Sequence, residues 1–373
     1  MICSGRDTAT GDFIAVEFDE TIRHVQLAGP EDRWIAPGFV DIQVNGFAGV
    51  DFNRPETSQP EIGRALDAIL STGVTRCLPT VITGPPEDMI ACLRNLARAR
   101  RELSLGRAFA GFHVEGPHIA PDDGPRGAHP LDSVRPPDID EYRRWQDATE
   151  GAIRLITLSP HWPDAVEYIS AITRDGVTAS IGHTGATAEQ IGAAVDAGAT
   201  LSTHIGNAGH AMLPKHPNYI WDQLAEDRLS ASFIVDGIHV GAAFLRAALR
   251  AKTVDRAVLV TDASAPAGAV PGRYRLGRQD ADLTPDGRVV LTGTNRLAGS
   301  ALKMNDAIAN VMRMAGVSLR DAVAMATTHP ARIVHMEGRL KGLVAGERAD
   351  LVVFRVGERI TIDAAYLDGE RAV

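Results

Sequence analysis

The residues of this sequence that could do chemistry are histidines and carboxylates that follow short apolar runs. Glu115 closes the run AFAGFHVEG (108–116), His183 stands in TASIGHTG (178–185), and His204 stands in ATLSTHIGN (199–207). Two imidazoles and one carboxylate that leave coordination positions open are typical of a catalytic zinc site, because closed structural sites more often use four protein ligands including cysteine. A histidine after a strand is, taken alone, more often a structural residue. The hypothesis therefore depends on the three side chains meeting in the fold.

Asp262 adds a group that could move protons. It stands in VLVTDASAPAG (258–268), after apolar and β-branched residues, where an unpaired carboxylate would be costly to desolvate. A metal ion lowers the pKa of a bound water to about 7, and a nearby carboxylate can take the remaining proton and return it to a leaving group. A helix N-cap or an Asx turn is the structural alternative for Asp262.

Apolar, β-branched runs alternate with helical patterns and predict the scaffold that must position these groups. Strands are expected at 39–46, 74–83, 108–116, 153–160, 178–185, 199–207, 230–240 and 257–264, and helices at 62–73, 89–103, 165–176 and 188–199. This alternation predicts an α/β protein, a (β/α)₈ TIM-like barrel, whose active site lies at the C-terminal ends of the strands. A doubly wound sheet is the alternative, but no GxGxxG turn follows the first strand.

The two ends of the chain depart from the barrel pattern. Residues 12–28 and 349–373 carry short alternating strand patterns with charged residues between them. If these segments pair, they form a small β-sandwich domain from both chain termini. The expected domains are 1–36 with 341–373 for the sandwich and 37–340 for the barrel.

Composition excludes several classes of partner. A net charge of −9 gives no basic surface for nucleic acid, and no apolar run approaches the ~20 residues that a membrane span needs. The three cysteines are odd in number and far apart, which argues against a disulfide framework and for a reducing compartment. The sequence predicts a cytoplasmic protein with a small-molecule substrate.

Several motifs together resemble the N-acetylglucosamine-6-phosphate deacetylases of the amidohydrolase superfamily, over almost the whole chain. They are PGFVDIQVNG (37–46), HVEGP (113–117), GHT (182–184), THIGNA (203–208), VDGIHV (235–240), LVTDASAPAG (259–268), LAGSAL (297–302), TTHPARIV (327–334) and GRLKGLVAGERADLVVF (338–354). The resemblance implies a distorted (β/α)₈ barrel with a small β-sandwich. It also implies an enzyme that hydrolyses N-acetylglucosamine 6-phosphate to glucosamine 6-phosphate and acetate.

The resemblance assigns roles to the residues introduced above. Glu115, His183 and His204 become the ligands of one divalent metal ion per subunit, and Asp262 becomes the general acid/base. Zinc is the expected ion, with Fe²⁺, Co²⁺ and Mn²⁺ as alternatives. Many superfamily members have a His-x-His for a second metal in the first strand. Here that position reads Gln43-Val44-Asn45, which implies a single metal.

Substrate contacts follow from the same resemblance. His129 would orient the substrate or its carbonyl, and His239 would touch the sugar. The backbone at Asn207 and Ala208 would meet the phosphate, and Leu297 would pack near the acetyl methyl. Family members are expected to be homodimers in which an arginine reaches the neighbouring subunit's phosphate site.

The loop NAGHAMLPKHPNYIW (207–221) lacks that arginine. Lys215, with His210 or His216, is the candidate phosphate anchor, although lysine lacks the bidentate fork of arginine. His161 stands where glutamate is expected. An alternative therefore stays open: a related metal-dependent amidohydrolase that deacylates an unphosphorylated or different N-acyl amino sugar, for example an N-acetylgalactosamine derivative. A non-catalytic sugar-binding barrel is disfavoured, because the expected ligands and Asp262 are all present.

Overall fold

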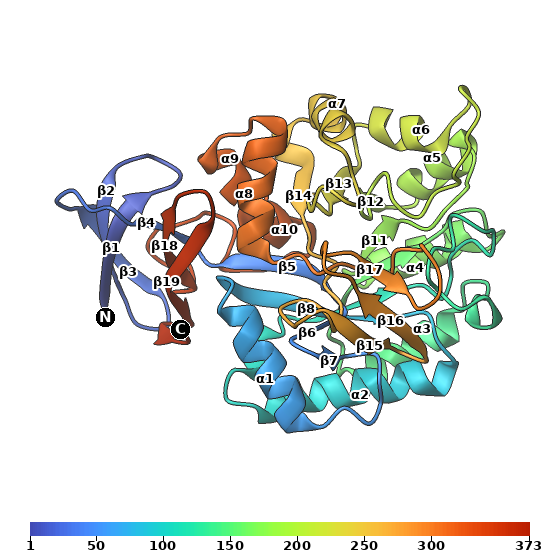
Figure 1. The fold of residues 1–373 in the computed structure, drawn as a ribbon, viewed down its shortest axis with the longest axis horizontal. Coiled ribbons are helices and arrows are strands. Elements are labelled where there is room, and N and C mark those ends of the chain that lie inside the picture. Colours follow the sequence, from blue (N-terminus) through green and yellow to red (C-terminus); the bar gives the residue numbers. More distant parts are fainter.

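The expected barrel strands form one parallel sheet in the computed structural model, which describes residues 1–373 (Figure 1). Its order is β14-β13-β12-β11-β10-β9-β8-β5. The strands are β5 Phe39–Val44, β8 Val74–Ile82, β9 Phe112–Glu115, β10 Ile153–Leu158, β11 Thr178–Ile181, β12 Ala199–Ser202, β13 Ser230–Phe233 and β14 Ala257–Leu259. The chain just after β14 closes the sheet, because Val44 forms a parallel bridge with Ala263 and the Asp262 amide donates to the Gln43 carbonyl at 3.0 Å. The predicted α/β barrel is confirmed.

Several strands are shorter than their apolar runs predict. The third begins at Phe112 rather than at 108, because Gly106–Ala108 form the 3-10 helix η1. The sixth and eighth end at Ser202 and Leu259, ahead of 207 and 264. Residues 203–205 and 260–264, beyond these ends, remain buried, so they continue the apolar pattern, but the backbone turns: φ is 29° at His204 and 49° at Asp262.

Helices cover the outside of the barrel (Figure 1). Their buried faces join the strands in one hydrophobic core. Two helices have capping boxes at their N-termini: Ser58 with Glu61 at α1, and Thr187 with Gln190 at α5. A capping box satisfies backbone amides that the helix itself leaves without an acceptor. The α-helices are α1 Gln59–Leu70, α2 Pro86–Glu102, α3 Ile139–Ala148, α4 Ala165–Arg174, α5 Ala188–Asp196, α6 Tyr219–Ala225, α7 Ala242–Lys252, α8 Met304–Ala315, α9 Leu319–Ala324 and α10 Thr328–Ile333; two further 3-10 helices are η2 Leu131–Ser133 and η3 Val254–Arg256.

The two chain ends fold together beside the barrel, as expected. They form one seven-stranded sheet of order β20-β19-β18-β4-β1-β2-β3. Phe18 of β2 and Tyr366 of β19 are far apart in this order, yet their rings meet edge to face at 5.1 Å, so the sheet folds over its own core. The strands are β1 Ile2–Asp7, β2 Phe13–Phe18, β3 Ile22–Leu27, β4 Trp34–Pro37, β18 Leu351–Val356, β19 Ile360–Leu367 and β20 Glu370–Arg371. The domain boundaries at 36/37 and 340/341 stay a prediction.

Asp350, just before β18, joins this terminal sheet to the barrel. Its carboxylate accepts a hydrogen bond from Arg76 Nε of β8 at 2.7 Å and pairs with Arg339. Its backbone carbonyl accepts from the Gly38 amide at 2.8 Å. All three charged side chains are buried, so the junction depends on their pairing.

A three-stranded antiparallel sheet, absent from our expectations, follows β14. It comprises β15 Gly272–Leu276, β16 Gln279–Leu283 and β17 Val289–Leu291. The sequence signal for it is Pro285-Asp286-Gly287, a turn signature between two runs with alternating apolar residues. A smaller pair, β6 Gly46–Phe47 and β7 Val50–Asp51, lies between β5 and α1.

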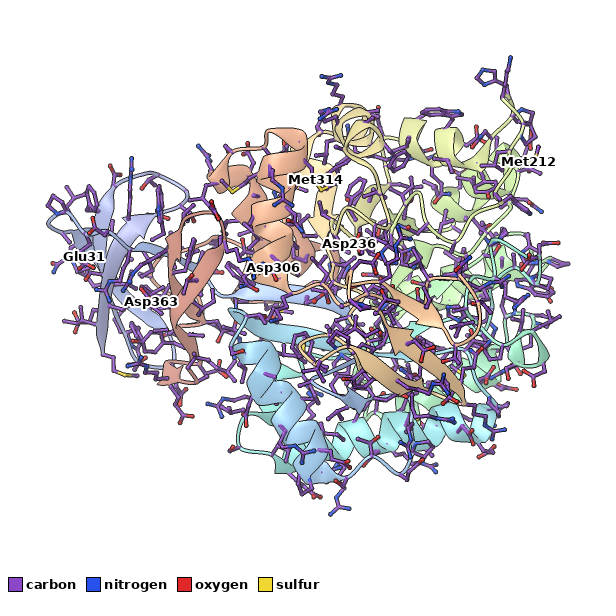
Figure 2. All side chains as sticks on the ribbon, viewed as in Figure 1. Glu31, Met212, Asp236, Asp306, Met314 and Asp363 are labelled. Atoms are coloured by element: carbon purple, nitrogen blue, oxygen red, sulfur yellow. The ribbon has the colours of Figure 1, made fainter.

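None of the helices combines the length and the hydropathy that a bilayer crossing needs. Met212 stands at the outer end of the loop between β12 and α6, with 91% of its surface exposed (Figure 2).

Candidate active site

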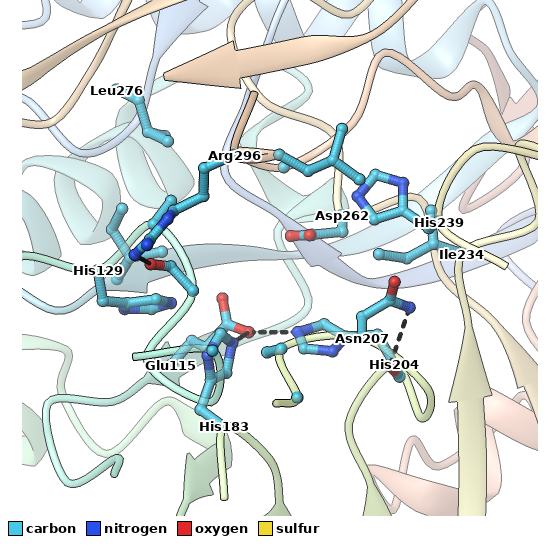
Figure 3. Close-up of a pocket in the computed structure, with 18 of the residues that line it drawn as sticks. Glu115, His129, His183, His204, Asn207, Ile234, His239, Asp262, Leu276 and Arg296 are labelled. Atoms are coloured by element: carbon cyan, nitrogen blue, oxygen red, sulfur yellow. Dashed lines mark hydrogen bonds and ion pairs between the residues drawn. The ribbon is translucent and has the colours of Figure 1, made fainter. Parts of the chain in front are cut away.

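A cavity of about 530 Å³ opens at the C-terminal ends of the barrel strands. Figure 3 shows how side chains from distant parts of the chain turn into it. Most residues singled out from the sequence line it: Asn45, Glu115, His129, His183, His204, Asn207, Ala208, His239, Asp262 and Leu297. The barrel therefore brings the candidate metal ligands, the candidate acid/base and the expected substrate contacts into one place.

The candidate metal ligands converge on one carboxylate oxygen. Glu115 is the last residue of β9, and its Oε1 lies 3.2 Å from His183 Nε2 and 2.9 Å from His204 Nε2. The ligand atoms of the three residues all lie within 4.8 Å of one another. His183 and His204 each follow their strand by two residues. The adjacent strands β11 and β12 supply the two histidines, and β9, separated from β11 by β10, supplies Glu115.

The hydrogen bonding of this cluster fits a divalent cation. His183 Nδ1 lies 2.9 Å from the Pro125 carbonyl oxygen, which can only accept, so Nδ1 carries the proton. The Nε2 lone pair then faces the Glu115 carboxylate, an arrangement that needs a cation or a second proton between them. His204 Nδ1 is buried without a hydrogen-bond partner. One carboxylate and two imidazoles are ligands that zinc accepts.

The charges of the cluster also fit a bound cation. Burial would raise the pKa of Glu115, but the hydrogen bonds and charges of His183 and His204 outweigh it and hold that pKa well below its usual range. Burial would lower the pKa of His204, but Glu115 raises it overall. Glu115 therefore remains ionised and gives the cluster a buried negative charge.

Asp262 lies in the same cavity and has the opposite electrostatic balance. Burial, followed by the negative charge of Glu115, raises the pKa of Asp262 to about 6, while the nearby His204, His239 and Asn45 oppose the rise. Two carboxylates with pKa values displaced in opposite directions suit one permanently ionised ligand and one group that exchanges protons near neutral pH.

Gln43 and Asn45 occupy the space between these carboxylates. Gln43 Nε2 donates to Glu115 Oε1 at 2.8 Å and to Asp262 Oδ1 at 3.1 Å, and Asn45 Nδ2 donates to the same Asp262 oxygen at 2.6 Å. Amide hydrogens thus stand where the His-x-His of a second metal site would be. This arrangement supports the expectation of a single metal.

The backbone at the candidate site is strained. His183, His204 and Asp262 have φ values of 50°, 29° and 49°, and Ala208 has 47°. A residue other than glycine in this region costs about 1–3 kcal/mol and persists only where its surroundings hold it. At these positions the turn aims a side chain into the cavity instead of continuing the strand.

The expected substrate contacts are held by specific partners. His239 Nδ1 lies 2.6 Å from Asp236 Oδ2, and the other Asp236 oxygen accepts the backbone amides of Ile238 and His239, each at 2.8 Å. His129 Nδ1 lies 2.7 Å from Thr83 Oγ1. Burial lowers the pKa of His129 to about 3, so its ring is neutral.

The remaining expected contacts divide into two groups. Asn207, Ala208 and Leu297 line the cavity, and Asn207 Nδ2 donates to the His204 carbonyl at 3.1 Å. Lys215 and His216 are exposed on the loop outside it.

Two other histidines also lie outside the cavity lining. His210 Nδ1 lies 3.1 Å from the Tyr219 hydroxyl, and His161 Nδ1 lies 2.7 Å from Ser159 Oγ. Local hydroxyl partners account for both rings.

Sequence reasoning missed part of the cavity wall. Arg296 lines one side together with Asp123, Gly124, Gly127 and Ala128. Leu276 of β15 reaches the cavity from the three-stranded sheet. Arg296 directly precedes the motif LAGSAL, which is the one signal that could have pointed to it.

The barrel and the buried Glu-His-His cluster define a metal-dependent barrel hydrolase. The chain belongs to the amidohydrolase family, whose model matches residues 34–372. It is 37% identical over 353 residues to the N-acetylglucosamine-6-phosphate deacetylase of Bos taurus, covering 90% of this chain and 82% of that one. It is also 31% identical over 353 residues to the N-acetylgalactosamine-6-phosphate deacetylase of Escherichia coli O157:H7, with 93% and 90% covered.

A solved structure shares the whole fold. It is a mutant of the N-acetyl-D-glucosamine-6-phosphate deacetylase of Mycobacterium smegmatis in complex with N-acetyl-D-glucosamine-6-phosphate. The TM-score is 0.90 at 30% identity, and the match covers 100% of this chain and 99% of the other. The resemblance inferred from the motifs is confirmed.

Proposed function

We propose that this protein hydrolyses the amide bond of N-acetylglucosamine 6-phosphate, giving glucosamine 6-phosphate and acetate. The observation that carries the proposal is that Glu115, His183 and His204 converge in the cavity that also contains Asp262. The names of the relatives from Bos taurus and Mycobacterium smegmatis support this substrate.

The proposed chemistry divides between a bound cation and Asp262. A divalent ion held by Glu115, His183 and His204, for which we propose zinc, would polarise the amide carbonyl and lower the pKa of a bound water. Asp262 takes a proton from the attacking water and returns it to the amide nitrogen as the C–N bond breaks. Asn45 and Gln43 fix the Asp262 carboxylate by donating to Oδ1.

The other lining residues would hold the sugar. His239, oriented by Asp236, contacts the sugar, and the backbone at Asn207 and Ala208 meets the phosphate. Leu297 packs near the acetyl methyl. His129 is neutral and fixed through Nδ1, so its other nitrogen can bond to the substrate carbonyl or a hydroxyl.

A homodimer is part of this proposal. Lys215 is exposed outside its own cavity, so as a phosphate anchor it would serve the partner subunit's cavity. Met212 precedes Lys215 in this loop and Trp221 follows it in α6. Both are exposed, by 91% and 51%, and suit a contact between subunits. Buried free thiols at Cys77 and Cys92 fit a reducing compartment, and we propose a cytoplasmic location.

Amine release from three substrates tests the function: N-acetylglucosamine 6-phosphate, N-acetylglucosamine and N-acetylgalactosamine 6-phosphate, with metal-loaded protein and Asp262→Asn as the blank. Strong preference for the first substrate is expected. Preference for the third would assign the activity for which the Escherichia coli relative is named, and turnover of the free sugar alone would remove the phosphate from the proposal.

A further inference from the structure

We propose that the three-stranded sheet β15–β17 and the segment after it position the metal ligand His183, with Arg296 as the main contact and Gln279 as the second. The inference rests on the proposed metal site. It concerns residues to which neither the family motifs nor the relatives' names assign a role.

Two side chains connect this region to the loop 121–130. Arg296 Nη1 donates to the Gly127 carbonyl at 2.8 Å, and Gln279 Nε2 donates to the neighbouring Ala128 carbonyl at 2.7 Å. Arg296 Nη2 also donates to Asp123 Oδ1 at 2.5 Å. Figure 3 shows Arg296 extended along the wall of the cavity toward His129. Three donors from outside the eight strand–helix units thus bind one short stretch of loop.

The same stretch of loop orients His183. Pro125, between the two residues that Arg296 contacts, supplies the carbonyl that accepts the His183 Nδ1 proton at 2.9 Å. Gly127 lies against the His183 ring, because a Cβ built on this glycine would stand 3.3 Å from Cε1. The His129 ring, two residues further on, meets the His183 ring at 4.4 Å. A shift of the loop would therefore rotate the His183 ring, or break the hydrogen bond to the Pro125 carbonyl that keeps the proton on Nδ1.

The Gly127 and Ala128 carbonyls are held by side chains from outside the loop. Within the loop, the Arg126 side chain donates to the Pro121 and His129 carbonyls, and the Gly127 amide donates to the Gly124 carbonyl at 3.0 Å. Gly124 and Gly127 have φ values of 97° and 58°. Glycines in this region leave the chain little intrinsic preference for one conformation. Asp123 is 75% exposed, so its ion pair adds little, and the Gly127 carbonyl is the important acceptor.

The test is zinc affinity, measured by titrating metal-depleted protein against a competing chelator. Arg296→Gln should weaken zinc binding by up to about 10-fold, the lower end of the range for groups that bond directly to a metal-bound histidine, because Arg296 acts on His183 through the loop. Arg296→Lys, which keeps one donor, should recover part of the loss, and Gln279→Ala should act in the same direction. Arg288→Gln is the matched control, because this exposed arginine of the same region pairs with Asp286 and does not contact the loop.

The outcomes separate this inference from the proposed function. If the wild-type protein binds zinc and Arg296→Gln binds it equally well, the positioning role is wrong and the function stands. A higher KM with unchanged zinc affinity would make Arg296 a substrate contact instead and would also overturn the inference. If the wild-type protein binds no divalent ion, the proposed function itself fails.

Discussion

Single residues in the cavity have their properties set by their neighbours. Glu115 and Asp262 both end apolar runs, yet Glu115 faces two imidazoles and Asp262 faces mainly amides and the charge of Glu115. One pKa is therefore lowered and the other is raised to about 6. This difference supports the proposed ligand role of Glu115 and the proposed proton-transfer role of Asp262.

The pH dependence of kcat/KM should show the titration of Asp262. Its raised pKa means that the carboxylate is protonated below about pH 6, so kcat/KM should fall as the pH drops through that value. The negative charge of Glu115 is one cause of the raised pKa of Asp262, and a cation bound to Glu115 would offset that charge. In the metal-loaded enzyme, kcat/KM should therefore fall at or below about pH 6. Steady-state rates at pH values from about 4.5 to about 8.5 measure this pH dependence of kcat/KM. A limb above pH 7 would contradict the assignment.

Replacing Glu115 by Gln should lower both bound metal and turnover, because the amide oxygen is neutral and weakly basic as a ligand. Metal content after dialysis gives the first quantity and amine release gives the second. Asp262→Asn is the matched comparison: it should keep its metal and lose about 10²–10⁴-fold in kcat. Full metal and full activity in Glu115→Gln would remove the ligand assignment.

The strands of the barrel position these residues at or just beyond their C-terminal ends, and not along their regular parts. β9 delivers Glu115 as its last residue, whereas His183, His204 and Asp262 stand on left-handed turns beyond β11, β12 and β14. The loop between β12 and α6 carries Asn207 at the cavity and Lys215 away from it. In the proposed homodimer, the two parts of this loop would serve different subunits.

Lys215→Ala should raise KM for the phosphorylated sugar about 10-fold, because one charge contact to phosphate, worth about 1.4 kcal/mol, is lost. Little change is expected in kcat or in any rate measured on N-acetylglucosamine. Lys341→Ala, another exposed lysine, should leave both substrates unaffected. Equal effects of Lys215→Ala on the phosphorylated and free sugars would exclude Lys215 as the anchor.

The whole molecule depends on the junction between the terminal sheet and the barrel. Asp350 stands at this junction with its charge fully buried between Arg76 and Arg339. Burial would raise its pKa, but the charges of Arg339 and Arg76 outweigh it and lower the pKa to about 2. These ion pairs attach the terminal sheet, built from chain ends more than 300 residues apart, to the barrel.

Asp350→Asn should lower the free energy of unfolding by about 3–5 kcal/mol, because it leaves the buried Arg339 guanidinium without its anion and leaves the buried Arg76 with Asp368 as its remaining carboxylate partner. Since the folded-state pKa lies below the unfolded value of about 3.9, the stabilisation is present above pH 4 and is lost as the pH falls toward 2. Denaturant titrations at several pH values measure it. Asp363→Asn removes a carboxylate whose partner Arg355 is 65% exposed and should cost under about 1 kcal/mol.

The sequence by itself determined the barrel, the pairing of the chain ends and the identity of Glu115, His183, His204 and Asp262 as candidates. Alternating apolar runs are local, and each of these polar residues follows its own run directly. Strand ends were less predictable, because buried turning residues continue the same apolar pattern. The β15–β17 sheet was missed although its turn signature is local.

Only the tertiary structure decided which partners each group has. The bond from Gln43 to Asp262 spans 219 positions and exists because the sheet closes after β14. The tautomer of His183 depends on a carbonyl 58 positions away, and the loop carrying that carbonyl depends on Arg296. Such contacts join residues whose separation in the sequence carries no pattern, so they follow from the closed barrel and its loops and not from local periodicity.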